Sequence, residues 1–349
     1  MKILQVSNGY FPSVGGVEVH VRNISERLAK RHEVTVFTTD SSGLPKKEEI
    51  NGVLIRRFRS FSPNNAYHVS FGMLKELRKS QFDIVHGHNY HALPLFFSRY
   101  ANKKRFIVTP HDYHRHGSSM LRDILIKLYK PFGKKIFQEA DRVIAVSNYE
   151  KDLLIEDFKI EAGKIMVIPN GVNLEEFRDL KKEEKDHKTI LYVARLEKFK
   201  GVQYAIQALP LLEESIRLEI LGKGPYKEKL IGLAKELRVA HRIDFYQDLH
   251  GRELLNRYAN ADLLMLLSKY ESFSIAVAEA LASRTPCILA NTAGLKEMVD
   301  NENCFGIDYP IIIDRLAELI NNVIGRKVGE VELWDWDEVV KQLETVYTA

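Results

Sequence analysis

The sequence predicts an α/β protein made of two doubly wound domains in succession, and three observations carry this prediction. The chain has 349 residues, which is long enough for two domains. Short apolar strands alternate with helical segments along its length, which is typical of parallel sheets covered by helices. A charged stretch at residues 175–188, without apolar periodicity, interrupts this alternation before it starts again.

The first half starts as a strand, a glycine-bearing loop and a helix. Residues 2–7 alternate between apolar and polar side chains, and residues 17–31 show helical spacing, with Val17, Val21, Ile24 and Leu28 on one face. Ligands of such sheets bind beyond the carboxyl ends of the strands. Further strands are predicted at residues 34–39, 53–58, 84–87, 106–109 and 143–146, and the histidines at the ends of two of them are His86, His88 and His111.

The second half repeats this order and closes on a helix. A last amphipathic helix is predicted at residues 334–347. Strands are predicted at residues 189–194, 217–221, 242–246, 262–267 and 287–290, and helices at residues 201–212, 226–237 and 251–259.

One segment of the second half, residues 269–282, combines features of a ligand site. Glu271 lies in a polar turn, and Ser272 or Ser274 is placed to cap the helix that follows, whose N-terminus is suited to an anion. That helix is apolar on every side except at Glu279, and a buried carboxylate is costly unless it is hydrogen-bonded. The alternative is a core helix whose Glu279 bonds to a neighbouring group, and the segment alone leaves both open.

Charge is divided unequally between the two halves. Residues 1–172 hold 27 Lys and Arg against 17 Asp and Glu, a net charge of +10, and the remainder holds 24 against 30, a net charge of −6. A basic half indicates an anionic partner, such as nucleic acid, a phosphorylated substrate or an acidic membrane surface. Two cysteines are too few for a disulfide framework or zinc site, and neither a signal peptide nor a membrane span is recognisable, so a cytoplasmic protein is expected.

Two segments offer contacts to phosphate. Gly9, Gly15 and Gly16 do not form the Gly-x-Gly-x-x-Gly pattern of a dinucleotide site, so this loop indicates either close approach of the backbone to an anion or sugar, or an ordinary tight turn. Arg195 and Lys200 follow the first strand of the second half and suit a diphosphate, because Arg recognises oxygens with a fork and Lys with a point charge. Ordinary surface ion pairing is the alternative for these two cations.

Two further features of the first half are weighed against simpler interpretations. His111, His114 and His116 have no zinc spacing and no nearby Cys, so a metal site is disfavoured there. Residues 122–137 mix basic and large apolar side chains, as in helices that lie on anionic lipid, but a packed helix with a solvated Lys face is favoured.

Taken together, these motifs resemble those of the retaining glycosyltransferases of family 4. That family has the GT-B fold, in which two Rossmann-like domains face each other across a cleft. The resemblance covers nearly the whole chain, and its specificity lies in the order and spacing of its motifs. They are Gly15-Gly-Val-Glu18, Asp83-Ile-Val-His-Gly-His88, Thr109-Pro-His-Asp112, Ala140-Asp-Arg-Val-Ile-Ala-Val-Ser147, Ile168-Pro-Asn-Gly-Val172, Arg195 with Lys200-Gly201, Leu221-Gly-Lys-Gly-Pro225, and a Glu-x7-Glu element from Glu271 to Glu279.

The resemblance implies a hexosyltransferase that moves a hexose-type sugar from a nucleoside diphosphate sugar to a glycan, lipid-linked or small-molecule acceptor, with retention. Arg195 and Lys200 would clamp the diphosphate, Glu271 would hold the sugar and Glu279 the ribose. The implied catalytic residues are His111, Glu271, Arg195 and Lys200. The implied donor-binding residues are Gly15, Gly16, Arg195, Lys200, Gly222, Gln247, Leu249, Phe273, Ser274 and Glu279.

The resemblance also sets expectations for partners and domains. It implies a UDP-, GDP- or ADP-sugar donor, no metal or cofactor and no nucleic acid. The basic first half, and not the resemblance, adds the expectation of peripheral contact with the anionic inner face of a membrane. The implied domains are residues 1–170, joined by the C-terminal helix 334–349, and residues 171–333. Departures from the family pattern at Ser274, Arg284 and residues 292–297 leave the implied phosphate and ribose ligands in place. A phosphorylase, a sugar-nucleotide epimerase and a non-catalytic nucleotide-sugar-binding protein are the alternatives.

Overall fold

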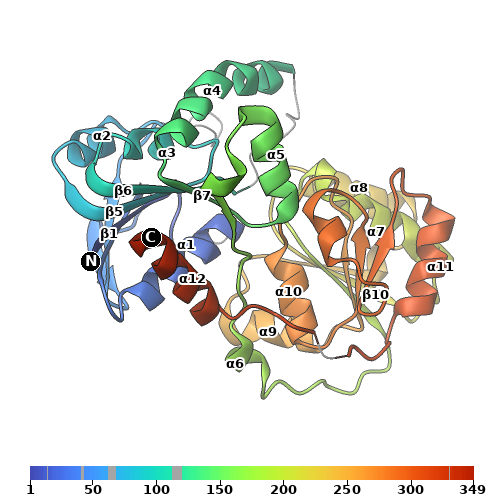
Figure 1. Cartoon of the computed structure of the whole chain (residues 1–349). Coiled ribbons are helices and arrows are strands. Elements are labelled where there is room, and N and C mark those ends of the chain that lie inside the picture. The colour runs from blue at the N-terminus through green and yellow to red at the C-terminus, as the bar shows by residue number, and fades with distance from the viewer. Residues whose placement is uncertain (14, 41–42, 62–67, 112–119, 330) are drawn as a thin grey trace. The chain divides into compact units, whose positions relative to one another are not determined.

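The chain divides into two compact units. The computed structural model describes residues 1–13, 15–40, 43–61, 68–111, 120–329 and 331–349, with the backbone alone for residues 120–127. Unit 1 comprises Met1–Gly171 and Trp336–Ala349, and unit 2 comprises Val172–Asp335 (Figure 1). The boundaries expected from the sequence, after residue 170 and before residue 334, lie one and two residues from these limits.

Unit 1 is built on a mostly parallel sheet. In the described part of the chain this sheet has eight strands in the order β3-β4-β2-β1-β5-β6-β7-β8. The β3 strand pairs antiparallel with β4 at one edge, and the other neighbours pair in parallel. The strands are β1 (Lys2–Val6), β2 (Glu33–Thr39), β3 (Lys47–Ile50), β4 (Val53–Phe58), β5 (Gln81–His88), β6 (Asn102–Thr109), β7 (Arg142–Ala145) and β8 (Ile165–Val167).

Helices connect these strands and cover both faces of the sheet. From β1 to β2 the chain moves toward one edge of the sheet, and from β5 to β6 it moves toward the other edge. Because both connections are right-handed, α1 lies on one face of the sheet and α3 on the other. Apolar side chains of β1, β2, β5 and β6 form the core with those of α2 to α5. The helices are α1 (Gly16–Leu28), α2 (Phe71–Leu77), α3 (Leu93–Ser98), α4 (Met120–Glu139), α5 (Asn148–Phe158) and α12 (Trp336–Thr348), with a 3-10 turn, η2 (Ala162–Lys164).

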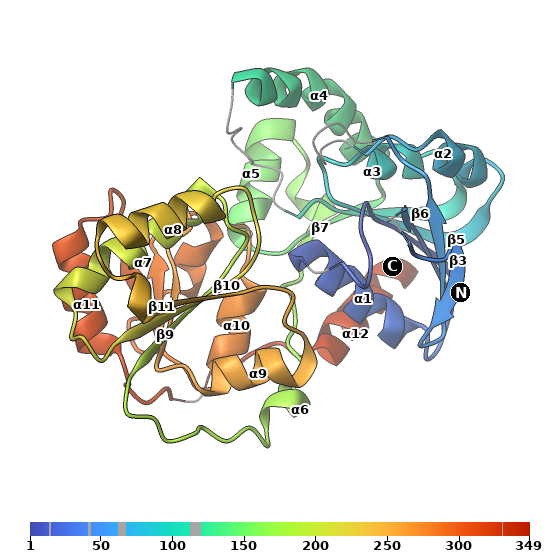
Figure 2. The same cartoon turned by 180° about the vertical axis from the view of Figure 1, so that it is seen from behind.

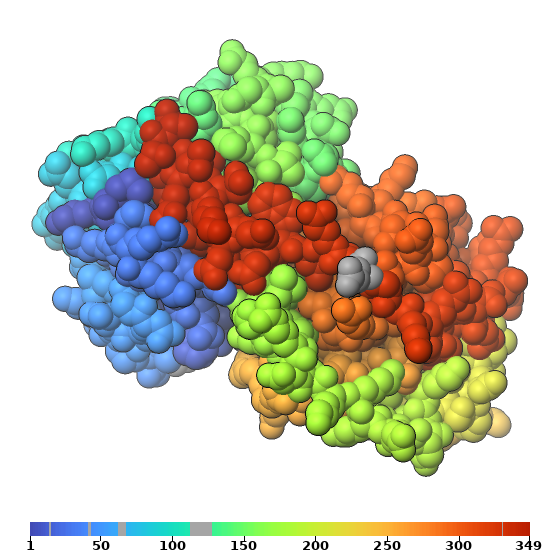
Figure 3. All heavy atoms as spheres, turned by 60° about the horizontal axis from the view of Figure 1, so that its bottom comes forward, coloured from blue at the N-terminus to red at the C-terminus, as the bar shows by residue number. Residues whose placement is uncertain are grey.

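The C-terminal helix α12 lies against α1. Trp336 at its start is fully buried. Arg27 of α1 pairs with Asp337 at 3.1 Å, and Arg31, just beyond α1, pairs with Glu344 at 2.8 Å. Figure 3 shows the C-terminal segment in red beside the blue N-terminal part of the chain. Buried apolar contact and ion pairs thus tie the end of the chain to its beginning.

Unit 2 is a smaller, fully parallel version of the same design. Over its described residues the sheet has six strands in the order β11-β10-β9-β12-β13-β14. Figure 2 labels β9, β10 and β11 of this sheet. The strands are β9 (Thr189–Val193), β10 (Arg217–Leu221), β11 (Ile243–Tyr246), β12 (Leu263–Leu266), β13 (Cys287–Ala290) and β14 (Cys304–Ile307). The helices are α6 (Leu174–Phe177), α7 (Val202–Ala208), α8 (Lys227–Glu236), α9 (Gly251–Ala259), α10 (Ile275–Ala282) and α11 (Ile313–Val323), with 3-10 turns η3 (Lys198–Lys200), η4 (Leu209–Leu211), η5 (Ala240–Arg242) and η6 (Ala293–Met298).

Each sheet reverses its strand order at one point, and this positions the candidate site. In unit 2 the chain runs outward from β9 through β10 to β11 and then returns to β12 on the other side of β9. Open α/β sheets bind ligands beyond the strand carboxyl ends at such a reversal. No helix among the described residues is both long and apolar enough to cross a membrane.

Candidate active site

The loops that follow β9 and β12 bring two predicted catalytic residues into contact. The two strands are paired, and beyond their ends the backbone N–H of Lys269 donates to the carbonyl of Phe199 at 2.8 Å. The ammonium Nζ of Lys200 donates to Oε1 of Glu271 at 2.5 Å, and the hydroxyl of Ser268 donates to the same oxygen at 3.2 Å. A cation and a carboxylate that are 71 residues apart in the sequence therefore form one cluster.

A buried tyrosine and a glycine hold these two loops together. The hydroxyl of Tyr192 donates to the carbonyl of Lys200 at 2.5 Å and accepts from the N–H of Leu267 at 2.7 Å. Gly201 has a φ of +81°, and a Cβ there would lie 2.1 Å from the carbonyl oxygen of Leu267. A side chain at Gly201 would push the two loops apart, so this glycine permits the approach of Lys200 to Glu271.

Arg195 lies at the same strand end but has a different partner. Its guanidinium donates to Glu197, and its side chain remains 56% exposed. The exposed fraction leaves much of the guanidinium facing solvent, where a further anion can reach it. The two cationic side chains that were predicted to bind phosphate, Arg195 and Lys200, therefore lie on one loop, and each is paired with a carboxylate.

The N-terminus of α10, at Ile275, follows Glu271 after a turn of three residues. Ser274 is its cap, because its Oγ accepts from the N–H of Val277 at 3.3 Å. Phe273 is half-buried. The η6 loop contacts this turn, since the N–H of Gly294 donates to the carbonyl of Glu271 at 2.8 Å. A Cβ at Gly294 would lie 2.1 Å from the carbonyl oxygen of Ser272, so glycine is required for this contact.

Glu279 lies one turn further along α10. The sequence led us to expect a buried carboxylate; the residue as a whole is partly exposed, but its carboxyl group is desolvated. Desolvation of the carboxyl raises the pKa of Glu279 to about 7, although the Tyr258 hydroxyl lowers it in part. That hydroxyl is fully buried and falls short of the geometry of a full hydrogen bond to Glu279. The carboxyl is thus suited to accept hydrogen bonds from a ligand's hydroxyl groups.

The remaining predicted donor contacts of unit 2 follow β10 and β11. Gly222 donates its N–H to the carbonyl of Tyr246 at 2.9 Å, and a Cβ there would lie 1.8 Å from the carbonyl oxygen of Ala194. Gln247 is exposed and Leu249 is half-buried. These residues share the strand-end edge with Lys200 and Glu271 but make no direct contact with them that the structure records among its described residues.

The glycine loop of unit 1 folds over a carboxylate. A Cβ at Gly9 or Gly15 would lie 2.3 or 2.5 Å from an oxygen of Glu18, in the first turn of α1. Gly16 differs, since a Cβ there would meet no described atom within 4 Å. A side chain at Gly9 or Gly15 would thus have to displace the movable end of Glu18, whereas Gly16 faces open space.

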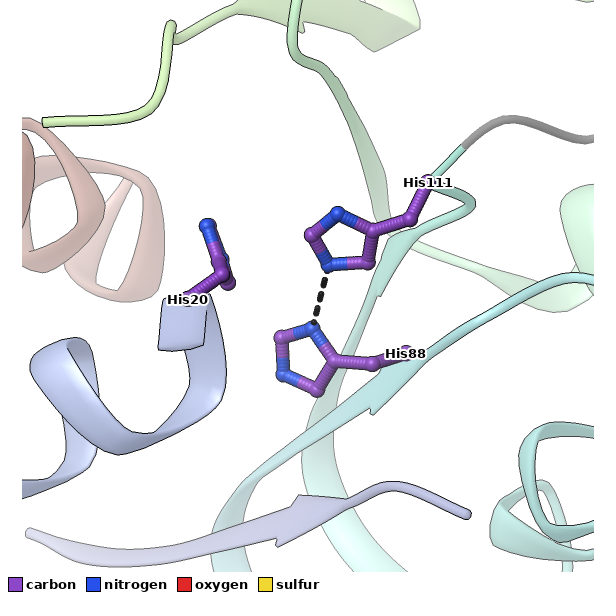
Figure 4. Close-up of side chains that lie close together, drawn as sticks. All are labelled: His20, His88 and His111. Atoms are coloured by element: carbon purple, nitrogen blue, oxygen red, sulfur yellow. Dashed lines mark hydrogen bonds between the residues drawn. The ribbon is translucent and has the colours of Figure 1, made fainter. Parts of the chain in front are cut away.

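Three buried histidines of unit 1 converge around His111 (Figure 4). His20 comes from α1, His88 ends β5, and His111 follows β6. Nδ1 of His88 lies 3.1 Å from Nε2 of His111, and the His20 ring is 4.5 Å from the His111 ring between centroids. His114 and His116, which were considered with His111, lie outside the described residues.

Amide side chains orient two of these rings. Nδ1 of His20 lies 2.7 Å from Oδ1 of Asn170, and Nε2 of His88 lies 2.8 Å from Oε1 of Gln5. An amide oxygen only accepts, so each of these ring nitrogens carries the proton. Nε2 of His20 is buried and has no hydrogen-bond partner.

The cluster is electrically neutral at ordinary pH. Burial lowers the pKa of His20 to about 4, although the hydrogen bond to Asn170 opposes this shift. Burial, and then the neighbouring histidines, also hold the pKa values of His88 and His111 well below the usual range for histidine. Each ring therefore has one unprotonated nitrogen, and in His88 this is Nδ1, which accepts from Nε2–H of His111.

Sequence reasoning missed His20 and its partner Asn170. A signal was present, because His20 lies on the apolar face of the helix that carries Val17, Val21 and Ile24. A polar side chain on such a face must be satisfied or have another role.

Comparisons with known proteins agree with the motifs and with the fold. The family model described as Glycosyltransferase Family 4 matches residues 14–176, and the model described as Glycosyl transferases group 1 matches residues 173–328. An uncharacterized glycosyltransferase of Methanocaldococcus jannaschii is 30% identical, covering 99% of this chain and 98% of that protein. A glycogen synthase of Mycobacterium tuberculosis is 31% identical, covering 93% of this chain and 86% of that protein.

Solved structures share the architecture. Sucrose-phosphate synthase from Thermosynechococcus elongatus superposes with a TM-score of 0.82 at 21% identity, covering 99% of this chain and 98% of that one. The Anabaena protein HepE in complex with UDP-glucose gives a TM-score of 0.82 at 18% identity, covering all of both chains. The predicted fold class, two Rossmann-like α/β units of the GT-B type, is confirmed.

Proposed function

Because this chain belongs to glycosyltransferase family 4, we propose that it transfers a hexose from a nucleoside diphosphate sugar to an acceptor hydroxyl, with retention of the anomeric configuration. The observation that carries the donor half of this proposal is the cluster of Lys200, Glu271 and Ser268 at the strand reversal of unit 2. It offers a cation for phosphate and a carboxylate for sugar hydroxyls at one place. The structure of HepE with UDP-glucose supports the donor class by analogy of fold.

In the proposed reaction the acceptor oxygen bonds to the anomeric carbon while the bond from that carbon to the diphosphate oxygen breaks. Negative charge grows on the departing diphosphate, and Arg195 and Lys200 stabilise it. The acceptor's proton passes to an oxygen of the departing diphosphate on the same face of the sugar. We propose that these two cations take the place of a metal ion on the diphosphate.

Glu279 and Glu271 have separate roles in this proposal. Glu279 accepts hydrogen bonds from the ribose hydroxyls of the nucleotide, and Glu271, with the N–H groups of Phe273 and Ser274, holds hydroxyls of the sugar. Gly222, Gln247 and Leu249 line the remainder of the nucleotide site. From unit 1, the resemblance assigns Gly15, Gly16 and His111 to the donor.

A surface patch on unit 1 supports a role for anionic lipid. We call it the α4 patch and define it as Tyr100, Leu128, Phe132, Lys134 and Lys135. Its apolar members are 43%, 63% and 54% exposed, and both lysines are exposed. Leu128 and Phe132 are four residues apart on one face of the helix. Lys135, three residues after Phe132, lies on the same face, and Lys134 lies on another side of the helix. Exposed apolar side chains with lysines around them favour contact with an anionic membrane, so we propose peripheral binding through the α4 patch.

Donor class and catalysis are tested with the whole chain. UDP, GDP, ADP and their glucose and mannose conjugates are screened for a rise in melting temperature, because a ligand of the native state stabilises it. The proposal predicts stabilisation by one base family and, with a suitable acceptor, a product whose anomeric proton coupling in NMR matches that of the donor. Inversion would refute retention. Donor binding without transfer or hydrolysis would instead indicate a non-catalytic binding protein.

A further inference from the structure

We propose that His20, His88 and His111 form a binding site for one divalent transition-metal ion of the Zn²⁺ class. Asn170 and Gln5 occupy one ring nitrogen each of His20 and His88, which leaves Nε2 of His20 and Nδ1 of His88 for a metal ion, together with Nε2 of His111. The potential ligand atoms all lie within 4.8 Å of one another, and the three residues are buried. Figure 4 shows the rings converging from three separate elements.

The spacing fits a metal after a small movement. Zinc binds histidine nitrogen at about 2.0–2.1 Å, so two ligands of one ion are at most about 4.2 Å apart. The 3.1 Å between His88 and His111 already lies inside this limit. All the separations in the cluster are within 4.8 Å, so side-chain rotation has to close at most about 0.6 Å.

The outer contacts are those of metal ligands. A histidine that binds a metal usually donates its second ring N–H to a carbonyl or carboxylate, which fixes the ring and its tautomer. His20 does so to Asn170 and His88 to Gln5, at 2.7 and 2.8 Å. This leaves the inward nitrogen of His20 as a buried lone pair without a partner. An unpaired buried polar atom is costly, and a bound ion would satisfy it.

The proton count is simple. Nδ1 of His88 has no proton, because its Nε2 donates to Gln5; it therefore accepts the Nε2 proton of His111. A metal ion takes the place of this proton, which moves to Nδ1 of His111. Three neutral imidazoles then bind the ion through lone pairs, and no redox partner is needed.

The donor set selects the type of ion. Three imidazole nitrogens suit Zn²⁺, Cu²⁺, Ni²⁺ or Co²⁺, whereas Mg²⁺ and Ca²⁺ prefer oxygen. Among the described residues, the potential metal ligands that gather at this place are these three histidines. Three protein ligands leave a fourth position for water, as in zinc sites that stay open.

Occupancy has a functional consequence that rests on the proposed function. His111 is assigned to the donor sugar, and coordination would fix its ring toward His20 and His88. The bound ion should therefore inhibit transfer rather than support it, and a chelator should restore activity.

The test uses the whole chain, free of any affinity tag and treated with chelator. Titration with Co²⁺ should give visible d–d absorption bands of the kind typical of four- or five-coordinate Co²⁺. These bands should stop growing at one equivalent of Co²⁺ and disappear when Zn²⁺ displaces the Co²⁺. Two variants remove a ligand nitrogen and keep the outer hydrogen bond. In His20→Asn the amide nitrogen replaces Nδ1, and in His88→Gln it replaces Nε2. Each should weaken binding by more than the roughly 10–100-fold typical of a lost outer contact.

The controls separate this site from surface binding. His241→Gln removes an exposed histidine of unit 2 and should leave the titration unchanged. Asn170→Ala should weaken binding about 10–100-fold while keeping all three ligands. Absence of the Co²⁺ spectrum, or its persistence in both ligand variants with folding verified by circular dichroism, would overturn the site. Stoichiometric binding with transfer unaffected would retain the site and remove His111 from the donor's contacts.

Discussion

Nζ of Lys200 lies 2.5 Å from Oε1 of Glu271, and the two side chains are 13% and 14% exposed. Two residues to which the family resemblance assigns different ligand groups, phosphate and sugar, are therefore partners in this structure. A largely buried cation is costly without a counter-charge. An incoming diphosphate would replace Glu271 as the partner of Lys200. Glu271 would then still accept a hydrogen bond from the hydroxyl of Ser268, and its other carboxylate oxygen would be available to a hydroxyl of the sugar.

Replacing Lys200 should affect the chemical step more than donor affinity. We expect Lys200→Met to lower kcat by about 10²–10³, as loss of a donor to a developing negative charge does, and Arg195→Ala added to it to lower kcat further. Initial rates at saturating donor measure this effect. Lys198→Ala is the matched control, because Lys198 is an exposed lysine of the same loop. Turnover near that of the native chain in Lys200→Met would remove the cation from the mechanism.

Lys200→Met also leaves the Glu271 carboxylate without its counter-charge. Loss of one partner of a buried pair costs about 3–5 kcal/mol of stability, whereas replacing both can be nearly neutral. We therefore expect Lys200→Met/Glu271→Gln to melt at a higher temperature than Lys200→Met. Additive effects of the two substitutions would show that the contact is energetically unimportant.

Nucleotide binding should depend on pH through Glu279. The carboxylate accepts hydrogen bonds from ribose hydroxyls better than the protonated acid, and the pKa of Glu279 is raised to about 7. Affinity for the nucleoside diphosphate should rise as pH increases from about 6 to 8, by at most tenfold per unit, in isothermal titration calorimetry. Glu279→Gln should bind more weakly and lose this dependence. Glu253→Gln, at an exposed carboxylate on α9, should behave as the native chain.

The same shift fixes the sign of a stability effect. The folded protein holds the Glu279 proton up to about pH 7, whereas the unfolded chain releases it near the ordinary value of 4.5. Between these values the native state binds more protons, so Glu279 makes the protein less stable as pH rises. Glu279→Gln should flatten this part of the stability profile in urea unfolding at pH 5 and pH 7.5. An unchanged slope would show that the carboxyl titrates normally.

Strand and helix order was predictable because apolar periodicity is local. The predicted strand at residues 189–194 is β9 (Thr189–Val193), and that at residues 217–221 is β10. The β3 strand was missed because its sequence, Lys-Glu-Glu-Ile, has no apolar alternation. It is held instead by antiparallel pairing with β4, which is a tertiary contact.

The site was predictable only as separate pieces. The sequence placed Lys200 and Glu271 at strand ends, but their contact depends on which strands are neighbours and on the room that Gly201 leaves. The partnership of His20 with Asn170 spans 150 residues and has no local signature. Glu279 was expected to be buried because α10 is apolar, but apolar composition does not specify how the carboxyl itself is covered.

Gly16 offers a test that does not disturb the folded protein. A Cβ there meets no described atom within 4 Å, so Gly16→Ala should leave the melting temperature nearly unchanged. If the backbone at Gly16 approaches the donor phosphate, the added methyl group should weaken donor binding or raise KM by about tenfold or more. Gly163→Ala is the matched control, since Gly163 is also an exposed glycine of unit 1 with open space around it. Equal donor kinetics in the two variants would exclude close approach at Gly16.

The α4 patch should bind anionic membranes through both charge and apolar contact. We expect the whole chain to sediment with phosphatidylglycerol-containing liposomes at low salt and to be released as salt screens the lysines. Phe132→Ser should reduce binding at all salt concentrations, because it removes an exposed apolar side chain, whereas Lys134→Ser/Lys135→Ser should act mainly at low salt. Ile312→Ser, at an exposed apolar residue of unit 2, is the control. Equal sedimentation with neutral and anionic liposomes, or failure to sediment with either, would contradict the assignment of this patch to an anionic membrane.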